Sequence, residues 1–216
     1  MNWDWNAVAD FMPHFWDGLL VTLQVLAIGS VISFVLGLVW ALLMRVPSRW
    51  VTWPVGTITE FIRNTPLLVQ LFFLFYVMPE WGLTFSALTT GVVGIGLHYS
   101  TYTMQVYRAG IEAVPVGQWE AATALNLPLH RTWSAVILPQ AIRRVVPALG
   151  NYVIAMLKDT PILMAITVLE MLGEAQLFAR ETFQFTEPLT VIGFAFIIIS
   201  YLASLALRAL ERRLVH

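Results

Sequence analysis

The chain contains no cysteine, a single lysine and few charged residues of any kind. Without cysteine, neither a disulfide framework nor thiolate chemistry is available to this sequence. Only 12% of the 216 residues are charged and the mean hydropathy is +0.74, whereas a soluble domain averages about 25% charged residues. This balance argues against an ordinary soluble domain and favours an integral membrane protein built from apolar helices.

Several catalytic signatures are missing as well. The lone lysine is Lys158 and Asp159 follows it, so the Lys-Ser/Thr pair of a nucleotide-binding P-loop is absent. Neither a His-Glu-x-x-His zinc pair nor a Gly-x-Ser-x-Gly elbow occurs, and the histidines are dispersed. We therefore expect a chain that is not an enzyme and has no metal or cofactor of its own. The net charge of −1 gives no indication of a nucleic-acid partner.

Apolar residues gather into segments that are each near the ~20 residues needed to cross a bilayer. These segments are roughly 18–43, 57–78, 87–107, 148–169 and 188–208. The predicted fold class is therefore an all-α integral membrane protein with about five transmembrane helices in a single domain, 1–216. Tryptophans before the first span favour the headgroup level, so we expect residues 1–17 to form a periplasmic interfacial segment, either a helix at the membrane surface or a loose tail.

Basic residues divide unevenly between the two sides of these spans. Nine of the 12 Lys and Arg residues follow spans one, three and five, whereas the opposite loops hold only Arg180. By the positive-inside rule, the N-terminus lies outside and the C-terminus lies in the cytoplasm. Residues 109–147 then form a long cytoplasmic loop between the third and fourth spans.

Small residues repeat every four positions along the first span, at Gly29, Ser33, Gly37 and Ala41. Such a stripe lets another helix approach closely. The neighbouring helix could belong to this chain or to a second one, and the sequence leaves both possibilities open.

The cytoplasmic loop contains a short predicted helix over 116–125. Asn126 and Pro128 end it, because Asn tolerates the left-handed conformation of a helix C-terminus and Pro blocks continuation. The chain then returns to the membrane as a second helical segment. Alanines give this helix–turn–helix a smooth surface that suits docking into a groove on another protein, although an amphipathic helix can also lie on the lipid surface.

This loop resembles the EAA motif in permease subunits of bacterial ABC importers. Glu120, Ala121 and Ala122 match the start of the motif, and Leu138 and Pro139 match its end with unbroken spacing. Departures occur in the middle of the motif, where Asn126 replaces the usual Gly and Val136 replaces Ile. Asn tolerates the left-handed backbone conformation that Gly usually adopts at this turn, and Val keeps a β-branched apolar side chain.

The resemblance extends over nearly the whole chain. Residues 60–76, 107–127 and 138–163 are similar to segments of the polar amino-acid permease branch. Within that branch, the chain resembles the permeases for ectoine and hydroxyectoine. The resemblance implies the ABC type I importer permease fold in a bacterial plasma (inner) membrane. It implies inward transport of a polar amino acid or of an amino-acid-like solute such as ectoine.

The resemblance also implies partners. A cytoplasmic ABC ATPase dimer would hold the ATP and Mg²⁺, and a periplasmic or lipid-anchored solute-binding protein would deliver the solute. A second permease subunit, either another copy or a homologue, would complete the pathway within the membrane lipid. Glu120 would meet a basic group of the ATPase, Ala121 and Ala122 would allow close approach, and Asn126 would set the turn.

Polar residues inside the spans are the predicted substrate pathway, because ionisable groups at membrane depth are costly and usually functional. Pro161 breaks the fourth span next to a charged pair that would complement a zwitterion. A structural ion pair or a contact between subunits explains the same pair equally well. The predicted pathway residues are Lys158, Asp159, Thr160, His98, Tyr102 and Gln105.

The sequence leaves two questions open, namely the transport class of the chain and the role of two glutamates. The chain could be a secondary transporter or channel that needs no ATPase, in which case the 109–147 loop has no coupling role. Glu170 and Glu174 follow the fourth span, where they could contribute to an outer gate, contact the binding protein or simply lie in a solvated loop.

Overall fold

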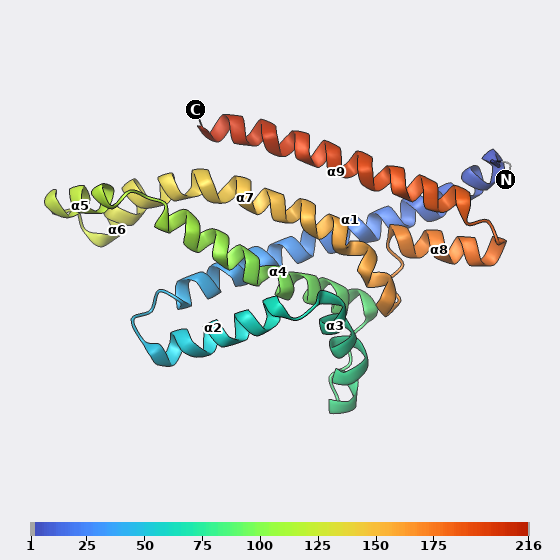
Figure 1. Ribbon diagram of the computed structural model, residues 1–216, viewed down its shortest axis with the longest axis horizontal. Coiled ribbons are helices and arrows are strands. Elements are labelled where there is room, and N and C mark those ends of the chain that lie inside the picture. Colours follow the sequence, from blue (N-terminus) through green and yellow to red (C-terminus); the bar gives the residue numbers. More distant parts are fainter. Residues whose placement is uncertain (1–2, 216) are drawn as a thin grey trace.

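The computed structural model describes residues 3–215 and shows an all-helical chain (Figure 1). Four long helices dominate it: α1 (Trp5–Leu43), α4 (Ala87–Glu112), α7 (Leu138–Asp159) and α9 (Thr186–Val215). The shorter α-helices are α2 (Arg49–Asn64), α3 (Leu67–Phe72), α5 (Val116–Ala124), α6 (Leu129–Arg131) and α8 (Met171–Thr182). Four irregular helical segments complete the chain. After α3 come η1 (Phe73–Val77) and η2 (Met78–Trp81), after α6 comes η3 (Thr132–Ile137), and after α7 comes η4 (Thr160–Ile166).

Within residues 3–215, three helices are long and apolar enough to cross a membrane: Trp5–Leu43, Leu129–Ile166 and Thr186–Arg213. A bent pair, Arg49–Asn64 with Leu67–Trp81, makes a fourth if it is counted as one span. The expected third span corresponds to α4, which has 26 residues but is too polar to pass the same test. The expected count of five spans is therefore not confirmed by apolarity.

The expected interfacial segment is continuous with the first span. Helix α1 begins at Trp5 and runs for 39 residues through Pro13. At 1.5 Å per residue it is roughly 58 Å long, nearly twice the ~30 Å hydrocarbon core. Several turns of α1 therefore extend beyond the core. Met1 and Asn2 lie outside the described residues.

The expected second span, 57–78, is sharply bent instead of straight. Thr65 is extended and Pro66 follows it, as the steric demand of proline on its predecessor requires. The helix pair is bent by 103° at this break, and the chain from α3 onward turns away from the direction of α2 (Figure 1). The Gln70 amide donates to the carbonyls of Ile62 (2.6 Å) and Thr65 (2.8 Å), which satisfies backbone acceptors that the break leaves open.

The small-residue stripe of α1 packs against α4 within the same chain. Gly29, Ser33, Gly37 and Ala41 are all buried. The Thr103 hydroxyl donates to the Ser33 carbonyl at 2.8 Å. The Trp40 indole N–H donates to the Ser100 hydroxyl at 3.2 Å. These side chains satisfy one another, so the polar residues of α4 are tolerated in the interior.

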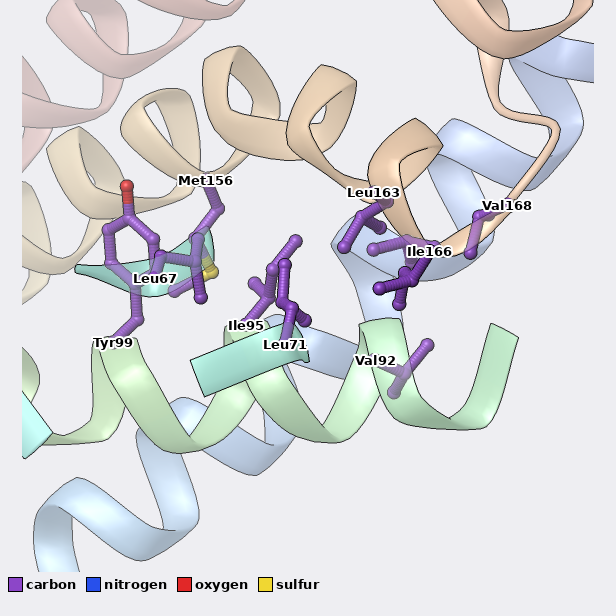
Figure 2. Packing of buried hydrophobic residues seen from close by; sticks show 10 residues of the cluster. Leu67, Leu71, Val92, Ile95, Tyr99, Met156, Leu163, Ile166 and Val168 are labelled. Carbon is purple, nitrogen blue, oxygen red and sulfur yellow. The ribbon is translucent and has the colours of Figure 1, made fainter. Parts of the chain in front are cut away.

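The largest apolar cluster joins α1, α3, α4, α7 and η4. Figure 2 shows Ile95 of α4, Leu71 of α3 and Met156 of α7 in this layer, with Leu163 and Ile166 of η4 beside them. Each of these five side chains is fully buried. The cluster fixes the irregular η4 segment and the short helix α3 onto α4.

Helix α8 is anchored at the end of the bundle opposite α5 and α6 (Figure 1). Glu170 caps it, accepting from the N–H groups of Leu172 (3.0 Å) and Gly173 (2.8 Å). Glu170 is fully buried, and this burial raises the pKa of its carboxyl to about 7. The His14 ring contacts the Glu174 carboxylate at 3.0 Å. The interpretation of Glu170 as part of a solvated loop is therefore wrong, because its carboxyl is a buried helix cap.

We predict that Gly37→Ala destabilises the protein by about 1–3 kcal/mol, the usual cost of overpacking. A Cβ at position 37 would lie 2.1 Å from the Thr103 hydroxyl and 3.0 Å from backbone atoms of α4. Gly193→Ala is the control, because its Cβ would meet nothing within 4 Å. Thermal unfolding in detergent, followed by tryptophan fluorescence, should separate the two variants. Equal melting temperatures would contradict the close α1–α4 contact.

Candidate functional site

The expected cytoplasmic loop forms a compact helical hairpin, which we call the coupling hairpin after its expected role and define as residues 116–137. Helix α5 ends where the sequence predicts, since Asn126 has a φ of 51°. The Leu127 N–H bonds to the Ala122 carbonyl (3.0 Å) and the Asn126 N–H to the Thr123 carbonyl (2.9 Å). These two bonds make a complete Schellman motif, so Asn126 serves here in the place of glycine.

A small core of its own makes the coupling hairpin rigid. Ile137 is fully buried and packs with Ile111 of α4. The Trp119 and Trp133 rings meet edge to face with their centroids 5.3 Å apart. The Arg45 guanidinium, just after α1, lies 5.3 Å from the Trp133 ring centroid. The hairpin is therefore attached to the ends of both α1 and α4.

The two alanines of the motif face different ways. Ala121 is exposed beside Glu120, whereas Ala122 is only 2% exposed. The expected smooth outer surface is therefore formed without Ala122, which packs inward. Leu125 and Leu129 are more than 70% exposed. A hollow of about 620 Å³ lies between the arms and is lined by Trp119, Glu120, Thr123, Ala124, Leu127, Leu129 and Thr132.

The end of the motif lies where the hairpin joins α7. The η3 segment, Thr132–Ile137, is a wide π-type turn that directly precedes Leu138 and Pro139. Pro139 lies in the first turn of α7, where a missing N–H costs nothing. Leu138 is 40% exposed, while Ile137 carries the buried contact. These two motif residues therefore define a junction and do not form part of the buried core.

A polar cluster lies deeper in the bundle between α4 and α7. The Tyr99 hydroxyl donates to the Asp159 carboxylate at 2.6 Å, and Figure 2 shows Tyr99 projecting from α4 toward α7. The His98 Nδ1 lies 3.0 Å from the Gln70 amide nitrogen. The Tyr102 hydroxyl donates to the Arg63 carbonyl at 3.4 Å. Three chain segments, α2–α3, α4 and α7, therefore meet here.

Aromatic rings hold this cluster together. The His98 and Tyr102 rings are 5.3 Å apart, and the Tyr102 and Tyr152 rings are 5.7 Å apart. The sequence interpretation did not single out Tyr152 or Gln70. Tyr152 precedes Asp159 by seven residues, so both lie on one face of α7, and this spacing was the available signal. No comparable signal pointed to Gln70, because its role depends on the bend at Pro66.

The remaining predicted pathway residues lie elsewhere. Lys158 is exposed and lines a groove with Ser200, Tyr201 and Ser204 of α9. The Thr160 hydroxyl donates to the carbonyl of Leu157 at 2.8 Å and is fully buried. Gln105 lines a separate hollow with Arg144. The structure thus brings together His98, Tyr102 and Asp159, and separates Lys158, Thr160 and Gln105 from them.

These features agree with the comparisons to known proteins. The profile described as "Binding-protein-dependent transport system inner membrane component" matches residues 33–216. The chain belongs to this family of membrane permease components, and the fold is the all-helical type I ABC importer permease fold. The family match bears out the resemblance at this level, and nothing in the comparisons distinguishes an ectoine branch.

Individual relatives are similar over nearly the full length. A probable amino-acid ABC transporter permease, y4tG of Sinorhizobium fredii, is 46% identical over 200 residues, 93% of this chain and 87% of the relative. The L-cystine transport permease TcyB of Bacillus subtilis is 34% identical, covering 97% and 91%. A crystal structure of an amino acid ABC transporter with histidines gives a TM-score of 0.93 at 32% identity, covering 99% and 100%.

We predict that Tyr99→Phe lowers the free energy of unfolding by about 1–3 kcal/mol, because it leaves the Asp159 carboxylate without its hydroxyl donor. Tyr201→Phe is the control, since Tyr201 is exposed on α9. Thermal unfolding of both variants in detergent measures the difference. The Tyr99–Asp159 bond would not be structural if both variants melted at the wild-type temperature.

Proposed function

We propose that this chain is the permease subunit of a binding-protein-dependent importer for polar amino acids, driven by a separate ATPase. The observation that carries the proposal is the preformed coupling hairpin, whose Glu120 and Ala121 lie exposed beside the hollow of about 620 Å³. The chain belongs to a family of inner membrane components of binding-protein-dependent transport systems, which supports a coupling role for that hairpin. ATP and Mg²⁺ would bind to the partner ATPase, since this chain has no P-loop.

The coupling hairpin would act as a rigid lever. Its small core and the Asn126 turn keep α5 at a fixed angle to α7. An ATPase dimer that closes would therefore displace the hairpin as a body, together with the ends of α4 and α7. The exposed carboxylate of Glu120 would meet a basic group of the ATPase, and the small side chain of Ala121 would permit close contact.

The polar cluster is our proposed solute pathway. His98, Tyr102 and Asp159 lie together, and all three belong to helices that the hairpin would move. The Asp159 carboxylate would attract the cationic group of a zwitterionic solute. Lys158 lies on the α9 side of α7, where it would face the solute or the second permease subunit across the assembled pathway.

The proposed substrate class follows the relatives, which are described as amino-acid and L-cystine permeases. Ectoine and hydroxyectoine are the narrower proposal within the class of amino-acid-like solutes, based on the sequence resemblance. A solute-binding protein on the outer side would select the solute. The chain would lie in the bacterial inner membrane with the coupling hairpin in the cytoplasm, as the arginine distribution indicates.

We predict that Glu120→Lys and Ala121→Asp each weaken binding to the ATPase about tenfold or more, because they place a repelling or bulky charge in the contact. Glu181→Lys is the charge-matched control, since Glu181 is exposed on α8 at the opposite end of the bundle. Co-purification with the ATPase and ATP-dependent uptake are the measurements. Wild-type assembly and uptake in both hairpin variants would count against coupling.

We predict that Asp159→Asn lowers ATP-driven uptake of amino acids about tenfold while the complex still assembles, because the carboxylate no longer attracts the solute cation. Asp10→Asn on the exposed part of α1 is the control. Uptake is measured in liposomes containing the ATPase and binding protein, with L-histidine, L-cystine and ectoine as competing solutes. Unchanged kinetics would remove Asp159 from the pathway, and uptake by this chain alone under a solute gradient would favour a secondary transporter.

A further inference from the structure

Helices α1 and α9 meet at the end of the bundle far from the coupling hairpin (Figure 1). Two adjoining hollows lie there. The first is an apolar groove of about 520 Å³, whose walls include Phe15 and Leu19 of α1 and Phe194 of α9. The second is a cup of about 410 Å³ that contains Asp4 and Glu187. Trp3 lines both hollows, so together they form one site with a polar and an apolar half.

The polar half carries negative charge, and the part of the chain that the structure describes places no cationic side chain in an ion pair with it. Glu187 is only 7% exposed, and its carboxylate accepts from the Asp4 N–H at 3.1 Å. The Asp4 carboxylate accepts from the Asn6 N–H at 2.8 Å. Among residues 3–215, the ion pairs involve His14, Glu174, Arg108 and Glu112, and neither Asp4 nor Glu187. A buried carboxylate is costly unless a counter-charge meets it.

The apolar half has the character of a lipid contact. It runs along the sides of two membrane-spanning helices, and nearly all of its lining is hydrocarbon or aromatic. Trp5 and Trp16 are 74% and 58% exposed at its rim. Tryptophan favours the headgroup level of a bilayer. The groove is therefore placed to hold an acyl chain while the cup lies among headgroups.

We propose that this paired site binds one aminophospholipid of the adjacent leaflet. Its ammonium group would lie between the carboxylates of Asp4 and Glu187, and one acyl chain would fill the groove below Trp3. The amide of Gln184 lines the cup and can donate to the lipid phosphate. An anionic lipid without an amine would bring no cation to the two carboxylates, and a soluble protein would leave the groove unfilled.

Native mass spectrometry of the full-length chain, purified in detergent, tests the proposal directly. The probes are dioleoyl phosphatidylethanolamine and dioleoyl phosphatidylglycerol at equal concentration. We expect one retained phosphatidylethanolamine per chain, preferred about threefold to tenfold over phosphatidylglycerol, the range of a modest ion pair.

Two pairs of variants assign the two halves. Glu187→Gln should abolish the headgroup preference while keeping an oxygen for the Asp4 N–H, whereas Glu181→Gln on exposed α8 should not. Ala195→Trp should fill the groove and release the lipid. Ala206→Trp, at an exposed position farther along α9, is its matched control.

Three results would overturn the proposal. Equal retention of the two lipids by the wild type would remove the role of the carboxylates. Equal loss of lipid in Ala195→Trp and Ala206→Trp would mean a non-specific lipid shell. A Glu187→Gln variant that keeps the lipid preference but binds the solute-binding protein more weakly would assign the cup to a protein cation instead.

Discussion

The absence of a side chain at Gly37 lets α1 lie directly against α4, and the rest of the structure depends on that contact. Helix α4 carries too many hydroxyl and imidazole groups to face lipid. Ser33 and Trp40 of α1 satisfy Thr103 and Ser100, so α4 can lie inside the bundle. An interior α4 in turn provides the surface on which α2, α3 and α7 pack.

The coupling hairpin and the polar cluster are built on the same two helices. Helix α4 carries Tyr99 at the cluster and Ile111 at the hairpin, while α7 carries Asp159 and begins at Leu138. If the hairpin moves one of these helices relative to the other, the Tyr99–Asp159 contact between them must change. In the proposed function, this arrangement would carry motion from a cytoplasmic ATPase to a solute in the membrane.

The local backbone conformation was predictable from the sequence where a single residue determines it. Asn126 and Pro128 fixed the hairpin turn, and Pro66 lies at the break after α2. The 103° angle of that break was not predictable, because it depends on the carbonyls that Gln70 satisfies across the gap. Lys158 and Asp159 are neighbours in sequence but face different helices, since successive residues of an α-helix point about 100° apart.

Burial was the least predictable property. Glu170 was expected in a solvated loop, an outer gate or a contact with the binding protein, and only its position against α8 shows that it is a helix cap. Counting spans by apolarity meets the same difficulty. A polar helix such as α4 is covered by other helices and therefore needs little apolarity of its own. A sequence pattern indicates which surroundings a helix tolerates, whereas packing determines whether it contacts lipid, water or other helices.

The most direct test of the central claim uses the absence of cysteine from this chain. Ala121→Cys introduces one exposed thiol on α5, where the proposed ATPase would bind. A short bifunctional thiol reagent should link that residue to a cysteine in the groove of the ATPase, and the link should form in the assembled, transport-competent complex. A thiol at position 121 that reacts freely with soluble reagents in that complex, yet never links to the ATPase, would contradict the account.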